Sequence, residues 1–135
     1  MSRVLAIGEA PGPRPSEVAL AEYERRIPGI SQMEIVKVLD YWPGRSGKGS
    51  AFPRQEARER AQVIWDEHPL KRRFLFIGIR TAQSFRIWAP DIAEWFDHRG
   101  RRVAVLPHPS GVNTIWWNQP ENREMVREFM GTVRV

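Results

Sequence analysis

Short apolar runs recur along the chain, and turn-forming or polar residues follow each of them. Runs of four or five residues that are rich in Val, Ile, Leu and Phe are typical of strands buried inside a parallel sheet. A further apolar segment, 92–96, fits either a helical turn or an edge segment of the sheet. We predict strands over 3–7, 35–39, 74–77 and 102–106.

Between these runs, the segment 53–67 carries apolar residues at spacings of three and four, which is the period of one helix face. Pro53 suits the first turn of a helix, and Asn118 followed by Glu121 fits a capping box. We predict helices over 16–26, 53–67, 81–87 and 118–130. Their expected inward-facing residues include Ala57, Ala61, Ile64, Trp65, Val126, Phe129 and Met130.

Strands and helices that alternate at this spacing predict a parallel sheet covered by helices on both faces. The expected fold class is α/β, a three-layer α/β/α sandwich with a four-stranded, mainly parallel sheet, in a single domain over 1–135. Ligands bind to such sheets beyond the carboxyl ends of the strands. The loops after the first and fourth strands therefore form the candidate site.

The composition excludes several kinds of site. The chain has 135 residues and no cysteine, which excludes disulfides, thiolate-bound zinc, iron–sulfur clusters and cysteine nucleophiles. His68 and His98 lack the spacing of metal ligands, so we expect no metal and no cofactor. No apolar run is long enough for a signal peptide or a membrane span. We therefore expect no membrane partner and a cytoplasmic location, and we expect a monomer.

The formal net charge is +5, and most of the cations are arginines. Guanidinium groups match phosphate oxygens and stack on bases, so DNA or a nucleotide is the expected partner. A basic surface that only increases solubility is the alternative. The basic clusters 71–73 and 99–102 precede predicted strands, at the edge opposite the candidate site, and we expect them to be solvated.

The loop after the first strand reads Gly8-Glu9-Ala10-Pro11-Gly12. Its glycines let the backbone turn tightly and approach a ligand closely, so we assign the loop to substrate binding. The Glu9 carboxylate follows the strand directly, where it could act as a base toward water or stabilise a developing cation. An ordinary turn with a solvated glutamate is the alternative.

The loop after the fourth strand contains His108 between two prolines that stiffen the backbone. His108 could donate a hydrogen bond to an oxygen that gains negative charge. Ser110, the Gly111 amide and Asn113 could all reach a phosphate. A surface histidine in an ordinary loop is the alternative.

The segments VLAIGEAPG and LPHPSGVN resemble the two signature motifs of the uracil-DNA glycosylase superfamily. The first is similar to the family-4 form, and the second combines the His-Pro-Ser of most families with the Pro-Ser-Gly of the mismatch-specific branch. FLFIGIRTAQSF resembles the third strand and helix of that fold, and QPENREMVREFM resembles its last helix. The resemblance implies an enzyme that flips a nucleotide out of DNA and hydrolyses its N-glycosidic bond.

The resemblance implies a role for each motif residue. Glu9 would lie beside the sugar and the attacking water, and His108 would stabilise the charge on the departing base. Ser110 and Gly111 would hold the phosphate backbone, and Val112 would fill the gap that the flipped base leaves.

The resemblance also bears on recognition of the base. Many members of the superfamily read uracil with an asparagine on the second strand, where this chain has Glu34. A carboxylate only accepts hydrogen bonds, so it suits a base with amino donors. Tyr41, Trp42 and Phe52 are candidates for the aromatic ring that stacks on the base, and Asn113 would support the second loop.

Two further features bear on nucleic acid. The loop 44–50 lacks the glycine spacing of a nucleoside triphosphate site, so we expect Arg45 and Lys48 to contact a DNA backbone. Trp116 could stack on a base; alternatively, one ring of the pair Trp116 and Trp117 lies in the core and the other covers a helix. Two functions remain open: a glycosylase, or a catalytically inactive module of the same fold that binds nucleic acid or a nucleotide.

Overall fold

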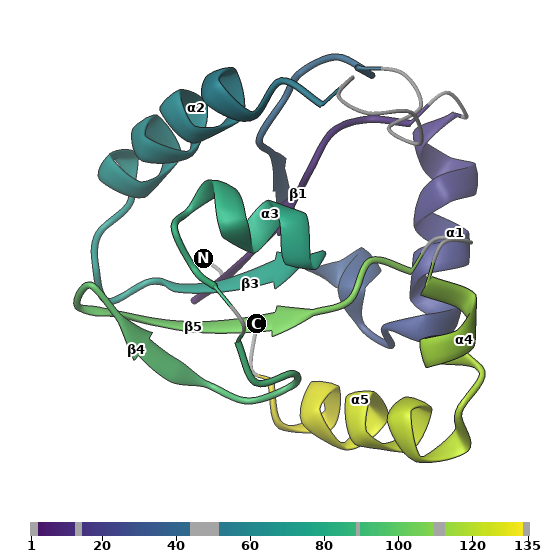
Figure 1. Ribbon diagram of the computed structural model, residues 1–135. Helices are drawn as coiled ribbons and strands as arrows, with labels where there is room; N and C mark the ends of the chain where they lie inside the picture. Colours follow the sequence, from purple (N-terminus) through teal and green to yellow (C-terminus); the bar gives the residue numbers. More distant parts are fainter. Residues whose placement is uncertain (1–2, 13–14, 44–51, 89, 110–112, 134–135) are drawn as a thin grey trace.

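The computed structural model describes residues 3–12, 15–43, 52–88, 90–109 and 113–133. Within these residues the chain forms one mixed sheet with the strand order β2-β1-β3-β5-β4 (Figure 1). The strands are β1 (Val4–Gly8), β2 (Glu34–Lys37), β3 (Arg73–Ile77), β4 (Phe96–His98) and β5 (Arg101–Leu106). All neighbours pair in parallel except β4, which pairs with β5 in the antiparallel direction.

Helices cover both faces of this sheet (Figure 1). The helical segments are α1 (Ser16–Arg26), η1 (Ile30–Gln32), α2 (Arg54–Glu67), α3 (Ile79–Ser84), α4 (Thr114–Trp117) and α5 (Pro120–Thr132). Leu5 and Ile7 of β1 pack under α2 and α3, while Val4 and Ala6 pack against α1, α4 and α5, because successive strand residues point to opposite faces. None of the helices in the described ranges is long and apolar enough to cross a membrane.

The predicted α/β class is confirmed, and the four predicted strands correspond to β1, β2, β3 and β5. The predicted inward faces of α2 and α5 are buried, as their spacing indicated. The expected number of four strands is wrong, because β4 adds an antiparallel edge strand. Segment 92–96 is irregular up to Phe96, where β4 begins. This three-residue strand carries an exposed Asp97 and therefore has no apolar run to reveal it.

The helices after β3 and β5 differ from the predictions. α3 ends at Ser84, and Arg86 then adopts left-handed backbone with a φ of 65°, so the helix does not reach residue 87. The capping box at Asn118 is also wrong. α5 begins at Pro120 with Gln119 at its N-cap, and Asn118 instead ends α4, which forms in a segment expected to be a loop. A proline suits this first position because its missing amide needs no cap.

Arg101 begins β5 and is fully buried, although its cluster 99–102 was expected to be solvated. The expectation is wrong because main-chain carbonyls replace water around the charge. The guanidinium donates, at 2.8 to 3.0 Å, to the main-chain oxygens of Trp65, His68, Pro69 and Arg72. Its carbon also lies 3.9 Å from the centre of the Phe74 ring. These contacts tie the end of α2 and the turn before β3 to β5.

We expect Arg101→Met to lower the free energy of unfolding by about 3 kcal/mol, since it leaves buried carbonyls without donors. Arg102→Met is the matched control, because the neighbouring Arg102 side chain is 51% exposed and contacts only surface groups; its effect should stay within about 0.5 kcal/mol. Urea unfolding followed by circular dichroism measures both changes. Equal losses for the two variants would contradict the structural role of Arg101.

Candidate functional site

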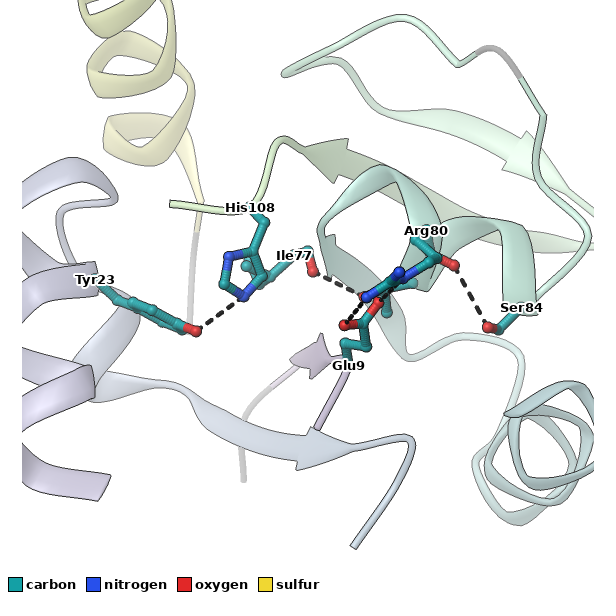
Figure 2. A network of polar contacts seen from close by, with 7 residues as sticks. Glu9, Tyr23, Ile77, Arg80, Ser84 and His108 are labelled. Carbon is teal, nitrogen blue, oxygen red and sulfur yellow. Dashed lines mark hydrogen bonds and ion pairs between the residues drawn. The ribbon is translucent and has the colours of Figure 1, made fainter. Parts of the chain in front are cut away.

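Four chain segments converge at the carboxyl edge of the sheet, where β1, β2, β3 and β5 end (Figure 2). Glu9 follows β1 directly, and Gly8 is paired in register with Lys37 of β2. Gly78 follows β3, which lies between β1 and β5 in the sheet. His108 lies two residues beyond β5, and its Cβ would be 3.5 Å from a Cβ placed on Gly78. The two motif residues Glu9 and His108 therefore flank the end of β3.

Arg80 of α3 holds the Glu9 carboxylate through both oxygens (Figure 2). Arg80 Nε donates to Oε1 at 2.5 Å and Arg80 Nη2 donates to Oε2 at 2.8 Å. The guanidinium also lies 4.1 Å from the centre of the Phe52 ring. Hydrogen bonding to Glu9 raises the pKa of Arg80 further above its already high value. The pair fixes the direction of the Glu9 carboxylate and places a cation against it.

The other residues of the first loop support this arrangement through their main chain and their packing, and Gly8 O accepts a hydrogen bond from Val38 N at 2.9 Å. Gly8 is buried beneath Lys37, and Ala10 packs against the core that α2 and α3 cover. Pro11 is half-buried, and no described atom lies within 4 Å of a Cβ placed on Gly12.

His108 is held on two sides. Its Nε2 shares a hydrogen bond of 2.9 Å with the Tyr23 hydroxyl of α1, and the two rings meet edge to face (Figure 2). Its main-chain oxygen accepts hydrogen bonds from Asn113 Nδ2 at 2.8 Å and from Trp117 Nε1 at 3.0 Å. Asn113 therefore supports the second loop, which is the role that the resemblance implied. Nδ1 of His108 is buried and has no hydrogen-bond partner among the described residues.

Burial lowers the pKa of His108 below the ordinary value of 6.5. The Glu9 carboxylate opposes this shift, while the cations Lys37 and Arg80 add to it. At neutral pH the imidazole is therefore uncharged and carries one N–H. In the unfolded chain the His108 pKa returns to about 6.5, so the unfolded chain binds a proton at a higher pH than the folded protein does. The free energy of unfolding is therefore unaffected by His108 above that value, and it decreases as the pH falls from there toward the folded pKa.

Lys37 is a site residue that the sequence analysis missed. Its Nζ lies 5.6 Å from the centre of the Tyr23 ring, and burial lowers its pKa while Glu9 opposes the shift. The absent side chain of Gly8 makes room for it, since a Cβ there would lie 2.9 Å from Lys37 Cδ and Nζ. The sequence analysis extended the second strand to 39, which placed Lys37 inside the strand and not at its end.

Arg80 was also missed. It lies three residues after the third strand, inside the segment FLFIGIRTAQSF that resembles the third strand and helix of the superfamily's fold. Its position two residues after Gly78 is a signal that could have found it, because the first turn of a helix after a parallel strand faces the carboxyl edge.

Three of the proposed base-recognition residues lie away from this cluster. Glu34 begins β2, at the amino edge of the sheet, where it accepts a hydrogen bond from Arg72 Nη2 at 2.5 Å that lowers the pKa of Glu34. The Tyr41 hydroxyl donates to Glu56 at 2.7 Å. Tyr41 and Trp42 are 41% and 48% exposed. Of the aromatic candidates, only Phe52 contacts the cluster, through Arg80.

The two adjacent tryptophans divide between the core and its edge. Trp117 is fully buried, and Trp116 is half-buried and packs edge to face on it at 4.9 Å. This matches the alternative in which one ring lies in the core. The remaining candidates, which are Ser110, Gly111, Val112, Arg45 and Lys48, lie outside the described residues.

No protein-family model matches this chain, and no curated protein matches it in sequence. No group of three His, Asp or Glu side chains that could hold a metal ion occurs in the ranges the structure covers. The functional argument therefore rests on the geometry of Glu9, Lys37, Arg80 and His108, together with the two loop motifs.

We expect the pKa of His108 to respond to its two charged neighbours in opposite directions. Glu9→Gln should lower this pKa, because it removes the carboxylate that favours the imidazolium, and Lys37→Met should raise it. Titration of the imidazole protons by NMR measures both shifts. His68 provides an internal control, since its charged neighbours are Arg72, Arg101, Glu34 and Glu67. A His108 pKa that moves with neither substitution would contradict the proposed cluster.

Gly8→Ala tests the position of Lys37. The new Cβ would lie 2.9 Å from Lys37 Nζ, so the flexible lysine must move while the strand remains in place. We expect the pKa of His108 to rise, as in Lys37→Met, with less than about 1 kcal/mol lost from the free energy of unfolding. NMR titration and urea unfolding measure the two effects. A large loss of stability with no pKa change would show that the methyl group displaces backbone and not Lys37.

Proposed function

We propose that this protein is a DNA glycosylase-like hydrolase that cleaves the N-glycosidic bond of a flipped uracil-like or modified base. The observation that carries the proposal is the placement of Glu9 and His108 on either side of the end of β3, where burial lowers the pKa of His108. A carboxylate and a neutral hydrogen-bond donor are the two groups that this hydrolysis requires, one on each side of the bond that breaks.

In the proposed reaction the bond between C1′ of the sugar and a ring nitrogen of the base breaks, and the electron pair leaves with the base. Glu9 stabilises the cationic sugar and accepts a proton from the water whose oxygen then bonds to C1′. Nε2–H of His108 leaves its hydrogen bond with the Tyr23 hydroxyl and donates to the oxygen of the base that gains negative charge, because Nδ1 is buried. The Lys37 ammonium, which is half-buried beside Gly8, adds a positive charge on the same side.

We also propose that the fold has the uracil-DNA glycosylase-like form. The motifs GEAPG and HPSGVN support this, as do the helices that cover both faces of the sheet. DNA is the partner, and the roles of Ser110, Gly111 and Val112 at its backbone stay predictions. We further propose a monomer in the cytoplasm, where a chain without cysteine needs no oxidising conditions.

One observation favours the second candidate, a catalytically inactive module that binds nucleic acid or a nucleotide. Arg80 occupies both oxygens of Glu9 and so weakens the negative charge that the sugar cation would need. In such a module the same cations, Arg80 and Lys37, would serve to hold phosphate. The two candidates differ in whether the free base is released.

Base release from labelled oligonucleotides separates these candidates. The panel contains uracil, hypoxanthine, xanthine, hydroxymethyluracil and mismatched thymine in single- and double-stranded DNA, and alkali converts each abasic site into a strand break. We expect Glu9→Gln and His108→Ala each to slow release by about 10²- to 10⁴-fold, because each removes a group that acts on the transition state. Glu124→Gln is the matched control for Glu9→Gln, since Glu124 lies on α5 with its side chain 52% exposed.

No release by the unaltered protein from any oligonucleotide would overturn the glycosylase. Salt-dependent DNA binding in that case would favour the second candidate. Release that persists undiminished in Glu9→Gln would place the catalytic group elsewhere.

A further inference from the structure

A groove runs between α2 and α3, next to the Glu9–Arg80 pair. It consists of two adjoining hollows that share Arg58 and Ser84. Arg54 and Arg80 line the first hollow, and Arg86 and Arg99 line the second. Each hollow encloses only about 10 to 20 Å³, which is room for little more than one water. The groove therefore does not enclose a base, but it offers a shallow track of arginines.

The charge of the groove has a single sign. Five of its lining side chains are arginines and none is a carboxylate. The α2 carboxylates Glu56 and Glu59 bond instead to Tyr41 and to Gln55. Across the ranges the structure describes, no ion pair involves Arg54, Arg58, Arg86 or Arg99. Unneutralised guanidinium groups in a row attract a polyanion, since neutralising its phosphates releases condensed counterions.

An exposed aromatic ring lies in the same groove. Trp88 lines the first hollow beside Phe52 and Arg80, and it is 61% exposed. The left-handed turn at Arg86, where φ is 65°, brings the chain out of α3 just before this tryptophan. An exposed indole ring gives a base a surface to stack on, provided that the base is unpaired.

We propose that the α2–α3 groove binds a single-stranded segment of nucleic acid, with phosphates on Arg54, Arg58, Arg86 and Arg99 and an unpaired base stacked on Trp88. This inference rests on the proposed function, which makes the Glu9 site the place that the bound strand leads to. Arg80 connects the two, because it lines the groove and also holds Glu9. The strand would thus lead from the outer groove to the carboxyl edge of the sheet. Four guanidinium groups that have no carboxylate partner among the described residues offer places for several phosphates, so the chemistry fits a chain of phosphodiesters.

The test is binding of fluorescein-labelled single- and double-stranded DNA, measured by anisotropy over a range of salt concentrations. The groove variant carries Arg54→Ala, Arg58→Ala and Arg86→Ala. The control variant carries Arg25→Ala, Lys71→Ala and Arg127→Ala, which remove the same formal charge from exposed positions outside the groove. We expect the groove variant to bind single strands at least about tenfold more weakly. The slope of log affinity against log salt should fall by about 2, at roughly 0.7 per lost phosphate contact.

Trp88→Ala separates stacking from charge. We expect it to weaken single-strand binding by about tenfold with the salt slope unchanged, because stacking releases no counterions. Equal losses for the groove and control variants would overturn the proposal, since net charge would then explain them. Duplex binding that exceeds single-strand binding, with no effect of Trp88→Ala, would also overturn it.

These assays read binding alone, so their outcome is independent of base release. If the unaltered protein releases a base while the groove variants bind normally, the groove proposal fails and the glycosylase stands. If no base is released while the groove variants lose binding, the glycosylase fails and the groove stands.

Discussion

Main-chain hydrogen bonds hold β1, β3 and β5 in a parallel register that ends the three strands at one edge of the sheet. Every feature of the candidate site depends on this alignment. It brings Glu9, Gly78 and His108 together although they are separated by about seventy and thirty positions along the chain. The parallel pairing of β1 with β2 places Gly8 opposite Lys37, so the lysine reaches the site from β2. The chemistry is thus assembled by backbone pairing, and each loop needs only to follow its strand closely.

This dependence explains what could be predicted from the sequence. β1, β3 and β5 are buried along nearly their whole length, so each contains an apolar run, and the residues that follow each run are candidates for the site. Glu9 and His108 were found in this way. β2 is only half-buried, and Lys37 interrupts its apolar residues. Lys37 was missed because the strand was expected to continue to residue 39, whereas β2 ends at Lys37. Glu34 was assigned to the site through the family resemblance, but it begins β2 and lies at the opposite edge of the sheet. The edge strand β4 carries no apolar run, so its pairing with β5 depends on tertiary structure.

The arginines of this chain cannot be told apart by sequence, yet their environments differ widely. Arg101 is fully buried and donates to carbonyl oxygens through Nη1 and Nη2, while its neighbour Arg102 is half exposed. Arg80 is paired with Glu9, and Arg58 faces an open groove. What separates them is the availability of acceptors: the end of α2 presents carbonyl groups to Arg101, whereas the α2–α3 groove presents no carboxylate. A cluster of basic residues therefore indicates neither a solvated surface nor a binding site until its acceptors are known.

In the proposed reaction, the electrostatics of the carboxyl edge would favour a leaving group that departs as an anion. An imidazolium would compete with Lys37 and Arg80 for the single negative charge of Glu9, and burial makes that arrangement costly, so His108 remains neutral. A neutral imidazole can donate one hydrogen bond without transferring its proton, which suits an acidic heterocycle whose anion is stable in a site that already holds cations. Tyr23 keeps the ring in place through Nε2, and its aromatic face lies near the Lys37 ammonium. The position of His108 and the charge beside it thus depend on one side chain of α1, which lies far from both motifs in the sequence.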